Sequence, residues 1–155
     1  MNWKRYFKDK SVAIIGNAEF DFKKEDDYDI IIRMNEADYY KGGHRTDILA
    51  MYHFVAVEHF LRIKPKHLWM TADRRRRKPN PYLLDLFWYP LERWQDLEKI
   101  LGTRPTTGMA VVDFVNCYTK TWDIFGYSFD YKQIGKGTHD VEREKEYIGK
   151  LKNER

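Results

Sequence analysis

The sequence predicts a single α/β domain over residues 1–155, with a mainly parallel sheet and helices on both faces. Short apolar runs at residues 12–15 and 30–32 are typical of strands buried on both sides. Stretches with helical periodicity alternate with the apolar runs, which favours parallel strands joined by crossover helices. The 155-residue length is enough for one domain with a substantial core. Together these observations favour a Rossmann-like arrangement.

The first half of the chain is expected to supply most of the sheet. A short amphipathic lead-in should pack Trp3, Tyr6 and Phe7 against it. The elements expected next are strands near residues 12–16, 29–34 and 47–52, a helix over 55–62 and a strand over 67–70.

The second half is expected to supply three helices and one strand. Apolar residues of one face and a stopping Gly102 predict a helix over residues 91–101. The next helix follows Pro105, is capped by Thr106 or Thr107, and is apolar enough to be nearly buried. A strand over 122–125, a loop over 135–138 and a charged helix over 141–151 complete the chain.

Composition narrows the compartment and the partner. The chain has no apolar run long enough to span a bilayer, no signal peptide pattern and a single cysteine, Cys117, so we expect a cytoplasmic protein without a membrane span. A net charge of +4 and a pI near 9.0 favour an anionic partner, such as a sugar nucleotide, an acidic glycan or a nucleic acid. Charge alone does not choose among them, and the oligomeric state stays open.

Polar residues follow two of the expected strands. Gly16 and Asn17 end the first apolar run, and Asn35 ends the second. Ligands of open α/β sheets bind beyond the carboxyl ends of the strands, where exposed backbone N–H groups can hold phosphate. We therefore expect the two asparagines to be neighbours at one site.

Four pieces of the sequence, in order, resemble a known family. They are GNA at residues 16–18 with DIIIRMNEA from residue 29, RPTTGM from residue 104, DIFGY from residue 123, and His139 with Glu144. This set is similar to the large, small and very small motifs of the sialyltransferases of glycosyltransferase family twenty-nine. The resemblance leaves residues 48–103 uncovered. It implies a variant of the glycosyltransferase A fold and a CMP-sialic acid donor, with no metal or other cofactor.

The resemblance also assigns roles to individual residues. His139 would be the general base, since an imidazole accepts a proton near neutral pH. The alternative is an ordinary solvated loop histidine. The donor nucleotide would be held by Asn17 and Asn35 at phosphate and ribose, by Thr106, Thr107 and Gly108 through backbone N–H groups, by Phe125, Gly126 and Tyr127 at the cytidine, and by Arg104 beside the phosphate.

Two departures from the family pattern keep other functions open. Val12 and Thr119 stand where animal members carry a disulfide, which favours a small bacterial or viral cytoplasmic version. The family's third motif, an HY pair, has no match at residues 131–133. The alternatives are a transferase that uses another CMP-sugar, such as CMP-Kdo, and a non-catalytic module that binds a nucleotide or, less favoured, a nucleic acid.

A dense basic run lies in the uncovered region. Arg74, Arg75, Arg76 and Arg77, followed by Lys78, could bind an acidic glycan acceptor or a nucleic acid backbone, or could simply be solvated. Nearby aromatic residues could offer faces to sugar rings, although more of them are expected in the core. These aromatics are Tyr82, Phe87, Trp88 and Tyr89.

Several other polar patterns are interpreted as structural. Asp27 and Asp29 have the D-x-D spacing of metal-dependent transferases, but they precede a strand and so lie at the wrong end of the sheet. Residues 135–137 are too short for a phosphate-binding loop. Arg33 is expected to pair with Asp47 or a carbonyl oxygen. The other histidines lack metal-ligand spacing and are interpreted as surface or core residues. They are His44, His53, His59 and His67.

Overall fold

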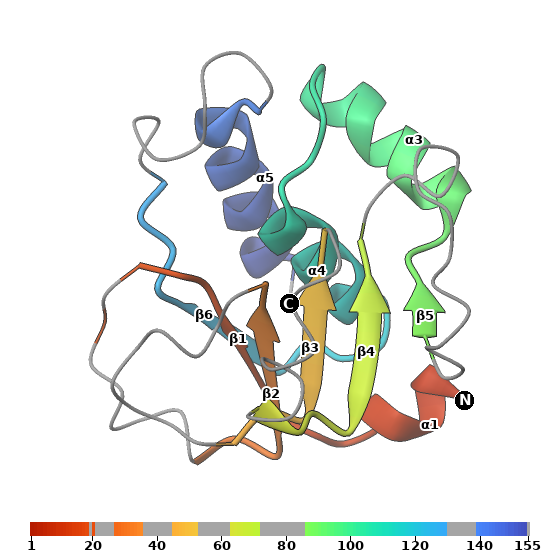
Figure 1. Cartoon of the computed structure of the whole chain (residues 1–155). Helices are drawn as coiled ribbons and strands as arrows, with labels where there is room; N and C mark the ends of the chain where they lie inside the picture. The colour runs from red at the N-terminus through yellow and green to blue at the C-terminus, as the bar shows by residue number, and fades with distance from the viewer. Residues whose placement is uncertain are drawn as a thin grey trace.

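The computed structural model describes residues 1–18, 20, 27–35, 45–52, 63–71, 86–129 and 139–154, which form a parallel sheet flanked by helices. The strands of this described part follow the order β5-β4-β3-β2-β1-β6 and all adjacent pairs are parallel. The expected α/β class is therefore confirmed, and the arrangement is compatible with a Rossmann-like domain (Figure 1). The strands are β1 Val12–Ile15, β2 Ile30–Met34, β3 Ile48–Met51, β4 His67–Met70, β5 Leu86–Trp88 and β6 Trp122–Phe125.

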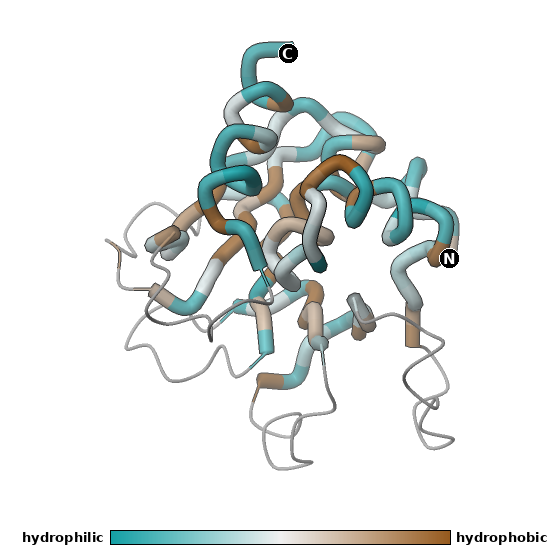
Figure 2. Tube along the Cα trace, turned by 90° about the horizontal axis from the view of Figure 1, so that it is seen from above, coloured by the Kyte–Doolittle hydropathy of each residue, from teal (hydrophilic) through white to brown (hydrophobic). Residues whose placement is uncertain are grey.

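The described helices pack together against one face of the sheet. They are α1 Trp3–Phe7, α3 Leu91–Leu101, α4 Thr107–Asn116 and α5 Val141–Asn153. Buried residues of all four share one apolar cluster with alternate residues of the strands, and the view from above shows the helices gathered on one side (Figure 2). None of the helices in the described ranges is long and apolar enough to cross a membrane.

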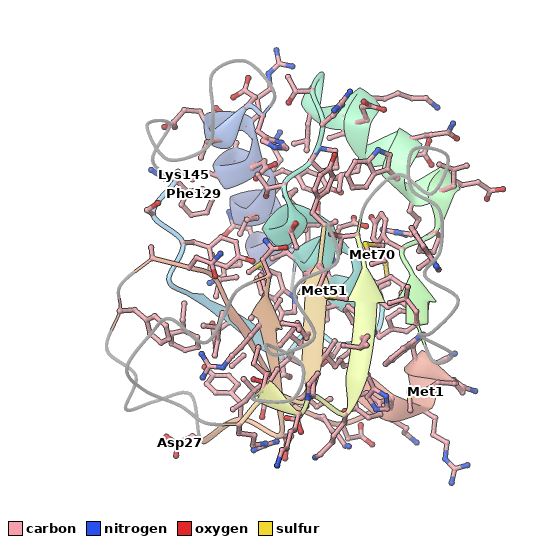
Figure 3. All side chains as sticks on the ribbon, in the orientation of Figure 1. Met1, Asp27, Met51, Met70, Phe129 and Lys145 are labelled. Carbon is pink, nitrogen blue, oxygen red and sulfur yellow. The ribbon has the colours of Figure 1, made fainter. Side chains whose placement is uncertain are left out.

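Strand residues alternate between the two faces, as the two-residue period of a strand requires. Val12 and Ile14 of β1 face the helices, whereas Ala13 and Ile15 belong to a separate cluster on the other face. Met51 and Met70, on the neighbouring strands β3 and β4, also pack on that second face (Figure 3). Every residue of β1 is buried, which explains why the strand is a continuous apolar run.

The main helix, α4, lies in the centre of the helical layer and is buried from Gly108 to Val115. Its one buried charge is paired, because Asp113 accepts from Arg93 of α3 at 2.7 Å and from the Tyr89 hydroxyl at 2.5 Å. These bonds connect α3 and the end of β5 to the central helix.

Most expected elements are confirmed to within one residue at each end. The strand over 67–70, the helix over 91–101 and the strand over 122–125 have the expected bounds, and Gly102 ends its helix with a φ of 70°. The edge strand β5 was not predicted. The expected helix over 55–62 and the loop over 135–138 lie outside the described residues, so the expectation of helices on both faces stays a prediction.

The buried charged residues Asp47 and Arg33 have structural partners. Asp47 forms ion pairs with Lys66 at 2.7 Å and Arg45 at 2.9 Å, and it accepts the Ile31 N–H. Arg33 Nε donates to the Arg45 carbonyl oxygen at 3.3 Å, which agrees with the carbonyl partner expected from the sequence.

Candidate functional site

A pocket of about 410 Å³ lies beyond the carboxyl ends of β1, β2, β3 and β6. The chain leaves β1 toward β2 and returns to β6 on the opposite side of β1, so this is the switch point where open α/β sheets bind ligands. The lining consists of residues 16–18 after β1, Met34 and Asn35 at the end of β2, Tyr52 after β3, residues 126–129 after β6, residues 105–108 at the start of α4, and His139, Val141 and Glu144 at the start of α5.

Two glycines let the turns after β1 and β6 approach closely. Gly16 N–H donates to the Phe125 carbonyl at 2.7 Å, and Ala18 N–H donates to the Gly126 carbonyl at 2.9 Å. A Cβ on Gly16 would lie 2.3 Å from the Gly126 carbonyl oxygen, and Gly126 has a φ of 63°. The backbone contact therefore requires glycine at both positions, and it fixes Asn17 in the wall of the pocket.

The asparagine at the end of β2 is held by β3. Asn35 has a φ of 51°, a left-handed conformation in which asparagine is enriched. Its N–H donates to the Ala50 carbonyl at 2.8 Å, and its Oδ1 accepts the Tyr52 N–H at 3.0 Å. Because Oδ1 is engaged, Asn35 can offer a ligand the two hydrogens of Nδ2. The side chain is therefore suited to contact phosphate or hydroxyl oxygens.

The amino end of α4 forms a further wall of the pocket. Thr106 caps the helix, because its Oγ1 accepts the Met109 N–H at 3.1 Å. The backbone N–H groups of the first turn, at Thr107 and Gly108, precede the intrahelical ladder and belong to residues that line the pocket. This end of the helix carries a partial positive charge, which favours an anion.

Gly108 is required by an aromatic ring. A Cβ on Gly108 would lie 2.8 Å from both Cε1 and the hydroxyl oxygen of Tyr127. Burial, followed by the negative charge of Glu144, raises the pKa of the Tyr127 hydroxyl. Tyr127 therefore stays a neutral phenol whose ring covers the amino end of α4.

The imidazole of His139 is held in one tautomer. Its Nδ1 lies 2.7 Å from the carbonyl oxygen of Arg104. A carbonyl oxygen accepts but does not donate, so Nδ1 carries the hydrogen and Nε2 of the neutral ring has a free lone pair. The adjacent Asp140 N–H donates to Thr103 Oγ1 at 3.1 Å, which attaches the start of α5 to the same loop. His139 thus has the proton arrangement that a general base needs.

Glu144 is the carboxyl group of the described lining. Its side chain reaches Thr106, which donates to Oε1 through its N–H and contacts Oε2 through its hydroxyl, both at 2.7 Å. The residue is only 3% exposed. Burial raises the pKa of its carboxyl to about 7, although the two bonds from Thr106 oppose this shift, and the negative charge of Asp140 adds to it. Glu144 therefore exchanges a proton near neutral pH.

Eight of the sequence-predicted residues line this pocket, namely Asn17, Asn35, Thr106, Thr107, Gly108, Gly126, Tyr127 and His139. Arg104 contributes its carbonyl oxygen to His139 but is not in the lining. The Phe125 ring packs against Phe20 and Tyr28 on the second face of the sheet. The basic run Arg74, Arg75, Arg76 and Arg77 lies outside the described residues.

Sequence reasoning missed part of the lining. The sequence pattern indicates Glu144 only through its spacing from His139, and it gives no functional signal at Tyr52 or Phe129. Tyr52 directly follows β3, so the same carboxyl-end rule that selected the asparagines could have found it.

The remaining polar patterns lie away from the pocket. Asp29 precedes β2 and bonds Ser11 through Oδ2, and Asp27 lies at the opposite end of the sheet from the pocket residue Phe129 (Figure 3). His67 begins β4 and packs its ring on Trp3 and Tyr6. His44, His53 and His59 lie outside the described residues. Among the residues that the structure describes, no three potential metal ligands cluster.

Comparison with known proteins finds no protein-family model that matches the chain and no curated protein that is similar enough to count as a relative.

Proposed function

We propose that the chain is a metal-independent, inverting glycosyltransferase that moves sialic acid from CMP-sialic acid to a hydroxyl of a glycan. The observation that carries the proposal is the convergence on one pocket of residues from all the motif pieces: Asn17, Asn35, Gly108, Tyr127 and His139. These residues are spread over more than a hundred positions of the sequence. An ordered resemblance that arose by chance would not be expected to meet at one switch point.

The chemistry requires a base and donors to the leaving phosphate. In the proposed reaction, the acceptor oxygen attacks the anomeric carbon from the face opposite the phosphate. The bond from that carbon to the phosphate oxygen breaks, and its electron pair leaves with CMP. The hydroxyl proton passes to Nε2 of His139, whose Nδ1 is fixed by the Arg104 carbonyl at 2.7 Å. The base is thus restored for the next turnover once it releases that proton.

Neutral donors would hold the departing CMP. The first turn of α4 and the Nδ2 of Asn35 can donate to phosphate oxygens, and Asn17 faces the same space. Asn35 is held by its bonds to the backbone of Ala50 and Tyr52, and Asn17 by the turn contacts around Gly16, so these side chains need little rearrangement as charge develops on the phosphate.

The contact between the segments around Val12 and Thr119 also supports the family resemblance. Family members in animals join the large and small motif regions by a disulfide, at places occupied here by Val12 and Thr119. In this chain Thr119 Oγ1 donates to the Lys10 carbonyl at 3.1 Å, and the Val12 N–H donates to the Thr121 carbonyl at 2.9 Å. The two segments are therefore adjacent without a covalent link.

The function is tested by CMP release from CMP-sialic acid with a panel of glycan acceptors, including acidic ones, and with CMP-Kdo as a second donor. His139→Ala should lower turnover by about 10²- to 10⁴-fold, the usual contribution of a general base. His67→Gln removes an imidazole at the amino end of β4, away from the pocket, and should retain turnover. Equal turnover by wild type and His139→Ala would show that His139 is not the general base.

Ligand-dependent thermal shifts separate the alternatives. CMP, but not UDP or GDP, should raise the melting temperature if the pocket is a cytidine site, because a ligand stabilises the state that it binds. Stabilisation by CMP without any turnover would instead indicate a nucleotide-binding module. Salt-sensitive binding of short DNA without an effect of CMP would indicate a nucleic-acid-binding protein.

A further inference from the structure

The pocket contains a buried carboxyl group that the proposed transfer reaction does not use. Glu144 is 3% exposed and lines the pocket, and both of its oxygens contact Thr106, the residue that caps α4. The carboxyl group therefore occupies the positive end of the same helix that is suited to an anionic ligand. A bound anion and an ionised Glu144 would compete for one favourable potential.

No compensating cation faces this carboxyl group in the described lining, which contains neither lysine nor arginine. The other titratable groups of the described lining are His139, just before α5, Tyr127, in the segment after β6, and Tyr52, after β3. Asp140, the residue that caps α5, also acts on the carboxyl group through its negative charge. Tyr127 stays neutral near neutral pH, and Asp140 adds negative charge. An anion brought beside an ionised Glu144 would thus be repelled in a poorly solvated space.

We propose that an anionic ligand occupies this pocket only when Glu144 is protonated, so that binding takes up one proton and weakens as the pH rises. Thr106 can adapt to both states. Its N–H donates to Oε1 in either state, and its Oγ1 can donate to an ionised Oε2 or accept from a protonated one. Protonation therefore removes the charge without breaking the contact that positions α4. The identity of the anion as a CMP-sugar rests on the proposed function, but the proton uptake does not.

The test is isothermal titration calorimetry in buffers of different ionisation enthalpy, which reports the protons taken up on binding. The probes are the methyl ester of cytidine 5′-monophosphate and sulfate, whose charges do not change between pH 6 and 9. Because burial raises the pKa of the carboxyl group to about 7, the wild type should take up about 0.8 proton at pH 7.5, and its affinity should fall about 25-fold from pH 6.5 to 8.5.

Variants identify the group that takes up the proton. Glu144→Gln is isosteric with the protonated acid and should bind with little uptake and a less than threefold change over the same range. Glu146→Gln removes an exposed carboxylate of the same helix and should behave as the wild type. His139→Gln should retain the uptake. Uptake that persists in Glu144→Gln and disappears in His139→Gln would assign the proton to the imidazole and overturn the inference.

Two further outcomes keep this inference distinct from the proposed function. Sulfate binding with proton uptake, together with no binding of the CMP ester, would refute the cytidine site and leave the inference standing. Failure of both probes to bind at pH 6 would overturn it. If Glu144→Gln does not fold, the carboxyl carbon of Glu144 in the wild type can be titrated by NMR, and its apparent pKa should rise when sulfate is added. An unchanged value would count against proton-linked binding.

Discussion

Glu144 should make the folded chain less stable, relative to a variant without the carboxyl group, as the pH rises toward neutrality. Its pKa is raised from the ordinary 4.5 to about 7, chiefly by burial, so the folded state binds more protons than the unfolded state between these values. The stabilisation of the folded state by the protonated Glu144 is fully present below pH 4.5 and is lost as the pH rises through 7. At 1.36 kcal/mol per pKa unit, the loss is about 3 kcal/mol.

The perturbation is Glu144→Gln, which keeps the shape of the protonated acid and cannot ionise. The difference in unfolding free energy between the variant and wild type should move by about 3 kcal/mol in favour of the variant from pH 4.5 to 8, or roughly 10 °C in melting temperature. Urea denaturation followed by circular dichroism measures it at each pH. Glu146→Gln, on the exposed side of α5, controls for the loss of a charge. A difference that is the same at both pH values would refute the assignment of a raised pKa.

Two further predictions use matched pairs of residues. Gly108→Ala should destabilise the fold by about 1–3 kcal/mol because the new Cβ would meet Tyr127 at 2.8 Å. Gly149→Ala should instead stabilise α5 by about 0.5–1 kcal/mol, because a Cβ there has nothing within 4 Å. Urea midpoints of the two variants that move in the same direction would contradict this contrast. Asp113→Ala should lower stability by about 2–4 kcal/mol because it leaves the buried hydroxyl of Tyr89 without its acceptor. Asp96→Ala, on the exposed side of α3, should change stability by less than about 0.5 kcal/mol. Similar losses in the two aspartate variants would show that the buried network is not stabilising.

The central strands could be predicted because their environment leaves a local signature. β1 and β2 are buried along their whole length, which produces a continuous apolar run in β1 and a run interrupted only by Arg33 in β2. The edge strand β5 leaves no such signature. It has three residues, all half-buried, and pairs with β4 alone in the described sheet, so its sequence does not differ clearly from that of an aromatic loop.

The residues of the candidate site also divide into those that the sequence could place and those that it could not. Asn17 and Asn35 could be placed because each lies within two residues of the end of a recognisable strand, and the carboxyl ends of parallel strands lie at one edge. The environment of Glu144 could not be predicted, since its two bonds reach a residue 38 positions earlier in the chain. The tautomer of His139 likewise depends on a carbonyl 35 positions away. Spacing in the sequence can nominate such residues, but their protonation is set by tertiary contacts.

The contrast between Asp47 and Glu144 shows how the fold distinguishes a structural carboxylate from a candidate functional one. Both are almost fully buried, and burial by itself raises the pKa of each. At Asp47 the bonds from Lys66, the Ile31 N–H and Arg45 outweigh burial, so its pKa is lowered and the charge is permanent. Glu144 has no ion pair within the described residues, and only the uncharged donors of Thr106 oppose burial. A buried acid without a counter-charge costs stability unless it is protonated, and such groups concentrate at functional sites. The lack of a counter-charge within the described residues therefore marks the carboxyl end of the sheet as the candidate functional site.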